Sequence, residues 1–437
     1  MQPTMGSIAV DDATLSRPPF KVLVVGGSYG GLSAALNLQD ICSGRAARCG
    51  PDAKKAALDG TSAAHDGPQF AVDITVVDER DGFYHLIGTP LAFADESYAE
   101  KCWVKYEDVP ALQQSPNNIR ILRGSVQSID QERKIAKVLG SENGPGPIEL
   151  KYDYLIAAAG LRRVFPVVPQ SLLRKQFLFE AGDHIQAATA NRHGVAVVGG
   201  GAVGIEMAAE LKLVCPDLKV TLIHSRDKLL SAEPLPEEVK DRSLELVHEA
   251  GVEVLMSHRV DRTEEFVDNG HKAYKVYFTN GHTLIADSVI MAISRSVPST
   301  TFLPRDVLNE EGYVKIQPSL HFPSESPNSD DHLAIGDLVK WSGIKRCGGA
   351  MHMGYLAANN IHMRMKQAVS GTEPTYLELD EIPPMIGLAV GKKAVAYWPT
   401  NGVSSGEDVN KLFFGDDLGF DICWNHLRLG GYDVVKA

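Results

Sequence analysis

The sequence predicts an α/β protein that contains the same strand–turn–helix–strand unit twice. The segments VLVVGGSYGG at 22–31 and VAVVGGGAVG at 195–204 each join an apolar strand to a glycine cluster, and a helical apolar period follows both. Downstream of each cluster another apolar strand ends in a polar residue, at Asp78 and at His224. Strands and helices that alternate in this way are typical of parallel sheets.

The composition excludes several classes of function. A chain of 437 residues with 44% hydrophobic residues is long enough for two or three domains. A net charge of -12 argues against a nucleic-acid partner, because binding phosphates requires a basic face. The six cysteines form neither a CxxC pair nor a repeated metal-ligand spacing, so we expect no metal site and no thiol–disulfide relay.

Targeting signals are not found at the N-terminus. Residues 1–18 lack a basic region followed by an apolar run, and no stretch approaches the roughly 18 apolar residues of a membrane span. We interpret 1–18 as a disordered tail and expect a cytoplasmic protein. An amphipathic C-terminal segment could touch a bilayer, but the stretch KLFFGDDLGFDI carries acids rather than the Lys and Arg of an anionic-surface binder, so membrane contact is possible but unsupported.

The first glycine turn departs from the GxGxxG fingerprint at its middle position. Gly26 would allow the tight turn and Gly31 close strand–helix packing, whereas Ser28 replaces the glycine at which backbone approaches a pyrophosphate. A glycine-rich turn of another α/β protein is the alternative interpretation. The strand that ends at Asp78 favours a dinucleotide, because an acid there accepts hydrogen bonds from a ribose. We interpret 43–69, which separates the helix from that strand, as a mobile surface insertion.

The second unit is complete, with Gly199, Gly201 and Gly204 in register. We expect one dinucleotide per unit, FAD in the first and NADPH or NADH in the second. His224 stands where an acid would favour NADH, and Arg226 offers donors suited to a 2′-phosphate, so we expect NADPH to be used at least as well as NADH. An arginine that points to solvent is the alternative.

Further segments complete the predicted fold. KYDYLIAAAG at 151–160 predicts a strand that leads to a turn at Gly160, and DHLAIGDLVKW at 331–341 predicts a strand that ends at Gly336 and Asp337. The segments at 119–130, 134–139 and 147–156 predict a strand meander. Asn280 and Gly281 predict a hairpin with a type I′ turn.

The motif order VVGGSYGG, VVDERDGFYHLIGTPL, YDYLIAAAG, VVGGGAVGIE and LAIGD resembles that of the pyridine nucleotide-disulfide oxidoreductases over roughly residues 20–365. It is most similar to the apoptosis-inducing-factor-like and ferroptosis-suppressor-like branch, fungal type, to which type II NADH dehydrogenases are related. The resemblance implies that Asp78 holds the adenosine ribose, that Asp337 accepts from a ribitol hydroxyl, and that Pro90 lies near the isoalloxazine. It also implies a pyrophosphate cradle made of Gly26, Gly27, Ser28, Gly30 and Gly31.

Three residues are catalytic candidates by this resemblance. Lys345 would steady reduced flavin or a quinone oxyanion, His85 would lie beside the isoalloxazine, and Glu206 would lie near the nicotinamide. Each has a plainer alternative: a solvated surface lysine, a hydrogen-bonded packing histidine, and a solvated glutamate that favours the helix dipole.

The resemblance further implies a split flavin domain at 19–163 and 287–368, a nicotinamide domain at 164–286 and a small C-terminal α+β segment at 369–437. Without CxxC, reduced flavin would pass electrons directly to a small-molecule acceptor, a quinone or similar aromatic. The leading hypothesis is therefore an FAD-dependent NAD(P)H oxidoreductase. A flavoenzyme of specialised-metabolite biosynthesis and a non-catalytic cell-death signalling protein are the alternatives.

Overall fold

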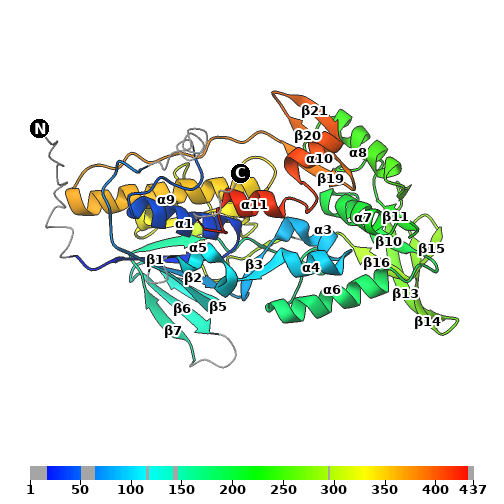
Figure 1. The fold of residues 1–437 in the computed structure, drawn as a ribbon, viewed down its shortest axis with the longest axis horizontal. Helices are drawn as coiled ribbons and strands as arrows, with labels where there is room; N and C mark the ends of the chain where they lie inside the picture. The colour runs from blue at the N-terminus through cyan, green and yellow to red at the C-terminus, as the bar shows by residue number, and fades with distance from the viewer. Residues whose placement is uncertain (1–16, 51–63, 115–117, 141–145, 294–295, 432–437) are drawn as a thin grey trace, which may run out of the picture.

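The computed structural model describes residues 17–50, 64–114, 118–140, 146–293 and 296–431. Its largest sheet is parallel from β18 to β5 and antiparallel from β5 to β7 (Figure 1). In spatial order its strands are β18 (His332–Ala334), β8 (Tyr154–Ala157), β1 (Phe20–Val25), β2 (Val72–Asp78), β5 (Ile119–Asp130), β6 (Ile135–Gly140) and β7 (Ile148–Lys151). The predicted meander is confirmed, except that the chain leaves it after β7 and crosses to the other side of the sheet, where β8 pairs between β18 and β1.

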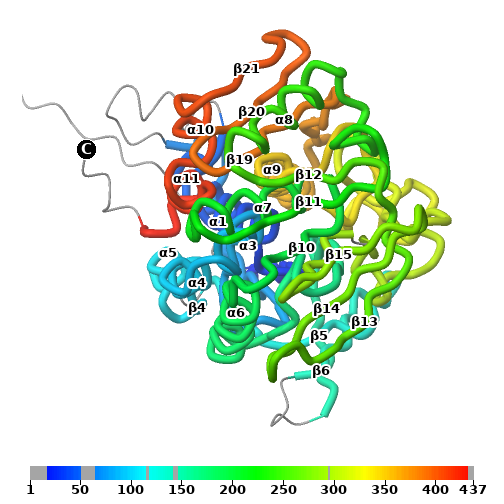
Figure 2. The backbone as a smooth tube through the Cα atoms, turned by 90° about the vertical axis from the view of Figure 1, so that its right-hand side faces the viewer, coloured from blue at the N-terminus to red at the C-terminus, as the bar shows by residue number. Residues whose placement is uncertain are grey.

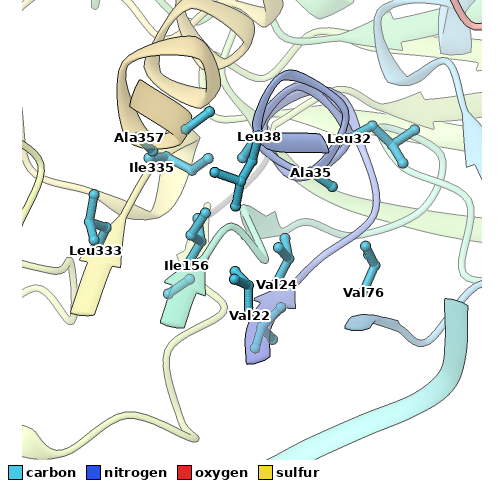
Figure 3. Close-up of a cluster of buried hydrophobic side chains, with 14 of the residues drawn as sticks. Val22, Val24, Leu32, Ala35, Leu38, Val76, Ile156, Leu333, Ile335 and Ala357 are labelled. Carbon is cyan, nitrogen blue, oxygen red and sulfur yellow. The ribbon is translucent and has the colours of Figure 1, made fainter. Parts of the chain in front are cut away.

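Two helices cover one face of this sheet, α1 (Tyr29–Cys42) and α9 (Cys347–Ser370). They approach closely because small residues face each other: a Cβ on Gly354 would lie 2.6 Å from the Gly30 oxygen. Apolar side chains from both layers interdigitate in Figure 3, where Val24 from β1 and Leu38 from α1 have no exposed surface. Each fully buried side chain of this kind stabilises the folded state by about 1.5–3 kcal/mol.

A second, wholly parallel sheet carries the other glycine cluster. Its order is β12 (Glu253–Leu255), β11 (Val220–Ile223), β10 (Val195–Val198) and β16 (Ser288–Met291). Helices α7 (Ala202–Val214) and α8 (Glu237–Glu249) pack against it. The antiparallel strands β13 (Val260–Asp268), β14 (His271–Phe278) and β15 (Thr283–Ala286) form a third sheet.

The predicted hairpin between β14 and β15 is present, but its predicted type I′ turn is wrong. A type I′ turn needs positive φ at both central residues. Gly281 has φ of +86°, whereas Asn280 is not among the residues with positive φ. The N–H of Gly281 donates to the oxygen of Phe278 at 3.0 Å. The loop therefore spans four residues, 279–282, and turns over Thr279 and Asn280.

Short elements join the seven-stranded sheet to the four-stranded one. Figure 2 shows α3 beside α7, and the two helices pack together. Strands β9 and β17 pair where the chain passes between the sheets in each direction. The bounds are β3 (Gly82–Tyr84), α3 (Thr89–Ala92), α4 (Glu96–Cys102), β4 (Trp103–Lys105), α5 (Pro110–Gln113), β9 (Leu161–Arg162), α6 (Arg174–Ala188) and β17 (Val297–Pro298).

The C-terminal segment is α+β. Strands β19 (Ile386–Val390), β20 (Lys393–Trp398) and β21 (Gly402–Gly406) form an antiparallel sheet that packs on α7 and α8. After α10 (Glu407–Phe413), the chain returns toward α1 and α9 as α11 (Phe420–His426), drawn in red in Figure 1. This segment therefore touches both halves of the molecule.

The predicted insertion at 43–69 lies partly outside the described residues, as does most of the predicted tail. Its described part is not wholly at the surface. Arg48 is 4% exposed, and its Nε donates to Asp40 Oδ2 at 2.8 Å, while its Nη1 donates to the Leu427 oxygen at 3.3 Å. The polar composition of 43–69 predicted a surface segment and gave no sign of this contact. Arg48 can nevertheless be buried, because its charge is paired with Asp40. Among the described residues, no helix is both long enough and apolar enough to cross a membrane.

Candidate functional site: two glycine cradles and the turn between them

The first cradle lies at the carboxyl end of β1, where ligands bind in open parallel sheets. Gly26 has φ of +108°, and a Cβ there would lie 2.5 Å from the Ala158 oxygen. A Cβ on Gly31 would lie 1.7 Å from the Gly26 oxygen. The fold therefore requires both glycines even without a ligand: Gly26 because of the turn, and Gly31 because the strand and the helix approach closely.

Ser28 is compatible with this geometry. It is the N-cap of α1, with φ of -99° and ψ of -153°, an extended conformation open to any residue. Gly201 holds the equivalent place before α7, with φ of -83° and ψ of 177°, and a Cβ on it would meet nothing within 4 Å. The serine therefore leaves the turn intact.

Asp78 closes the first cradle from the end of β2. Its Oδ2 accepts from the Gly27 N–H at 2.6 Å and its Oδ1 from the Arg80 N–H at 2.8 Å. Burial raises the pKa of Asp78, while these two bonds and the Arg80 charge oppose the rise. Tyr106 donates from its hydroxyl to the Gly27 oxygen at 2.9 Å.

A cavity of about 190 Å³ opens beside Asp78. Its wall is strongly charged and includes three arginines, Arg80, Arg162 and Arg163. Arginine donors of this kind fit an anionic or polar ligand. Arg80 itself donates from Nη2 to the Pro169 oxygen at 3.4 Å, and its guanidinium lies 5.8 Å from the ring centroids of Tyr84 and Trp103. The polar part of the lining consists of Asp78, Glu79, Arg80, Ser125, Arg162, Arg163, Gln170, Ser299 and Thr301.

The second cradle repeats the first. Gly199 has φ of +126°, and a Cβ on Gly204 would lie 1.8 Å from the Gly199 oxygen. His224, at the end of β11, accepts from the Gly200 N–H at its Nδ1 over 3.1 Å, and its Nε2 lies 3.0 Å from Ser231 Oγ. Nδ1 is thus an acceptor, so the proton is on Nε2. Burial lowers the pKa of His224, which favours this neutral form.

Arg226 lies at the exposed rim of the second cradle. Its Nη1 donates to the Ser231 oxygen at 3.1 Å. Its guanidinium therefore stays on the same side as His224, with further donors open to solvent.

A third turn follows β18. Gly336 has φ of +77°, and burial raises the pKa of Asp337 while the Lys345 charge opposes it. Lys345 donates from Nζ to the Asp337 oxygen at 2.6 Å and to the Val339 oxygen at 2.9 Å. The lysine thus holds the backbone of this turn. Nε of the adjacent Arg346 is buried without a hydrogen-bond partner among the described residues.

His85 is fully buried and both ring nitrogens have partners. Nδ1 lies 3.1 Å from Tyr29 Oη, and Nε2 lies 3.0 Å from the Leu418 oxygen. Burial lowers the pKa of His85 to about 4. This placement matches the packing alternative. Pro90, in α3, is also buried, and Gly160 has φ of +65° in the turn after β8.

Glu206 faces the C-terminal sheet rather than open solvent. Its Oε1 accepts from the Ala389 N–H at 3.4 Å, and burial raises its pKa to about 8. One helical turn on, Glu210 is 2% exposed, and burial raises its pKa to about 8 as well. Sequence analysis did not identify Glu210, although its i+4 spacing from Glu206 placed both on one helix face.

Arg80 and Arg346 were also missed. Arg80 directly follows the VVDE strand end, and Arg346 directly precedes α9. Their positions beside the predicted turns are the only feature of the sequence from which they could have been identified.

Two strand–turn–helix units of this geometry are typical of proteins that bind two dinucleotides. The family model for the pyridine nucleotide-disulphide oxidoreductases matches residues 20–354, and the chain belongs to this family. It is thus an oxidoreductase, and membership implies a flavin and a nicotinamide cofactor.

Relatives and solved structures agree with this assignment. Oxidoreductase OXR1 of Ajellomyces capsulatus is 50% identical over 97% of this chain and 90% of its own length. Ferroptosis suppressor protein 1 of Mus musculus is 28% identical over 86% of this chain and 91% of its own. The water-forming NADH oxidase from Lactobacillus brevis, bound to NADH, has a TM-score of 0.59 and 17% identity over 86% of this chain and 74% of that one, which shows the shared fold.

Proposed function

We propose that this protein is an FAD-dependent NAD(P)H oxidoreductase that passes electrons to a quinone or a similar aromatic acceptor. The observation that carries the proposal is the equivalence of the two cradles. A Cβ on Gly31 would lie 1.7 Å from the Gly26 oxygen, and a Cβ on Gly204 would lie 1.8 Å from the Gly199 oxygen. One chain thereby offers two pyrophosphate sites at helix N-termini.

The first cradle fits FAD. Asp78 would accept from the adenosine ribose, and the Arg80 guanidinium, which lines the same cavity, would donate to an acceptor atom of the cofactor. Asp337 would accept from the ribitol, and Lys345 would keep the backbone of that turn in place. In this proposal residues 19–163 and 287–368 bind the flavin.

The second cradle fits NADPH or NADH, held by residues 164–286. His224 is neutral, so it does not repel a 2′-phosphate, and Arg226 at the rim has free donors for one. Glu206, whose pKa burial raises to about 8, would lie near the nicotinamide by the family resemblance, with its Oε1 held by the Ala389 N–H.

The flavin, when bound, supplies the hydride and electron chemistry. A direct acceptor is favoured because the sequence contains no CxxC. A quinone suits that role, because it takes up two electrons and two protons to become an aromatic hydroquinone.

Anaerobic spectroscopy tests the proposal. Gently purified protein should show flavin absorbance that bleaches on adding NADPH and returns on adding a short-chain ubiquinone analogue. A flavin-free protein that added FAD does not reconstitute would contradict the cofactor. Recovery with a small disulfide but not with the quinone would contradict the acceptor. Bleaching without recovery by either compound would favour a specialised-metabolite acceptor.

A further inference from the structure

Two cysteines that are 76 residues apart in the sequence meet beside the third turn. Cys347 is the first residue of α9, and Cys423 lies within α11. Their Sγ atoms are 3.9 Å apart. Both are free thiols.

The remaining thiols lack such a neighbour in the part of the chain that the structure describes. Cys42 Sγ lies 4.0 Å from Met365 Sδ, Cys102 Sγ donates to the Ala99 oxygen, and Cys49 Sγ lies 3.6 Å from the His426 oxygen. No other pair of cysteine sulfurs is in hydrogen-bond contact among the described residues.

The two thiols differ in their surroundings, as an attacking and a resolving thiol should. Cys347 is half-buried at a helix N-terminus, where the dipole favours a thiolate. A hydrogen bond with Cys423 lowers the pKa of Cys347, and the Gly348 N–H adds to this effect. Cys423 is 3% exposed, and its hydrogen bond with Cys347, together with burial, raises its pKa.

We propose that Cys347 and Cys423 form a reversible disulfide by exchange with a low-molecular-weight disulfide, and that this bond fastens α11 to the start of α9. To form the bond, the Sγ atoms need to approach from 3.9 Å to about 2.05 Å.

The exchange balances in two steps. The Cys347 thiolate attacks one sulfur of the small disulfide RSSR, giving Cys347–S–S–R and one thiolate RS⁻, which takes up the proton that Cys347 released. The Cys423 thiol then loses its proton and attacks the Cys347 sulfur, and the second RS⁻ leaves and is protonated. The protein thiols are oxidised to one disulfide, and RSSR is reduced to two RSH.

The bond would fix the C-terminal segment at the third turn. In α11, Phe420 stacks on Trp424 with ring centroids 5.5 Å apart, and Phe420 also contacts the His85 ring. Just before α11, the Leu418 oxygen bonds His85. A covalent link at Cys423 therefore restrains the segment that packs on His85. The proposal does not depend on which electron acceptor the protein uses.

Thiol counting on the full chain tests the proposal. The native protein is equilibrated with oxidised glutathione, quenched in acid, unfolded and alkylated, and its mass and peptides are measured. The wild type should lose two of its six alkylatable thiols, retain no glutathione and yield one peptide that links Cys347 to Cys423. Dithiothreitol should restore all six. The oxidised form should also exchange amide hydrogens within 420–426 more slowly than the reduced form.

Variants separate the two roles. Cys423→Ser should retain one glutathione on Cys347, because no resolving thiol remains, whereas Cys347→Ser should retain none on Cys423. Cys215→Ser, at a half-buried cysteine away from the pair, should still form the link. Glutathione retained on wild-type Cys347, a link between other cysteines, or six free thiols at every glutathione ratio would overturn the proposal. The thiol count and the linked peptide of the wild type test the proposal even if a variant fails to fold.

Discussion

The backbone N–H of Gly200 donates to Nδ1 of His224 over 3.1 Å, and this bond repeats the one from Gly27 to Asp78 Oδ2. A histidine thus closes the second cradle as a carboxylate closes the first. The two residues differ in charge, because neutral His224 carries a proton on the nitrogen that faces Ser231, whereas Asp78 offers acceptors. The same loop geometry is therefore compatible with two different nucleotides.

Removing Arg226 should selectively weaken use of NADPH. Its exposed guanidinium is held beside His224 by the bond to the Ser231 oxygen. A hydrogen bond to a charged group contributes about 1.5–3 kcal/mol, so Arg226→Ala should lower kcat/KM for NADPH at least about tenfold and leave NADH nearly unchanged. Steady-state kinetics with both nucleotides provide the measurement.

Arg262→Ala is the matched control, because this exposed arginine lies in β13 and pairs with Asp261 and Glu264. Arg262→Ala should leave kcat/KM unchanged for both NADPH and NADH. An equal loss with NADPH and NADH in Arg226→Ala, or a strong wild-type preference for NADH, would contradict the assignment.

Ser28→Gly should leave flavin content nearly unchanged, whereas Gly31→Ala should abolish it. Ser28 adopts an extended conformation that needs no glycine, but a Cβ at position 31 would overlap the Gly26 oxygen at 1.7 Å. The flavin-to-protein absorbance ratio after purification and FAD reconstitution measures both. Loss of flavin in Ser28→Gly would show that the hydroxyl contacts the cofactor.

Local patterns in the sequence were sufficient for the two strand–turn–helix–strand units and their glycine turns, but not for β12 and β16, which complete the second sheet. The roles of Gly26, Gly31 and Gly204 depend on short spacings within one unit, and the structure places their close contacts accordingly. Contacts between distant segments left no such pattern. The meeting of Cys347 with Cys423 depends on the return of α11 to α9, which no local period encodes. The type I′ prediction failed because Asn-Gly allows that turn without requiring it.

Asp337→Ala should lower flavin occupancy more than Lys345→Ala does. Asp337 is the proposed direct acceptor, whereas Lys345 acts on the carbonyl oxygens of Asp337 and Val339. Loss of the lysine should instead destabilise the turn by about 1 kcal/mol. Flavin content together with the midpoint of thermal unfolding separates the effects, and equal flavin retention in both variants would refute this order.

Glu210 should make the folded protein less stable as pH rises toward 8. Burial raises its pKa to about 8, whereas an unfolded glutamate titrates near about 4.3. Between these values the folded state keeps a proton that the unfolded state releases. The free energy of unfolding therefore falls with rising pH in this window, and the contribution of the group is constant below and above it. Glu206, with its pKa also raised to about 8, acts in the same direction.

Glu210→Gln should flatten this dependence. The amide has the shape of the protonated acid and cannot ionise, so the variant should resemble the wild type near pH 5 and exceed it in stability by about 1 kcal/mol or more near pH 8. Urea unfolding at pH 5, 6, 7 and 8 gives the free energies. Glu238→Gln, at an exposed position on α8, should follow the wild-type curve. Parallel curves for Glu210→Gln and the wild type would mean that Glu210 is ionised throughout, in spite of its burial between α7 and the C-terminal sheet.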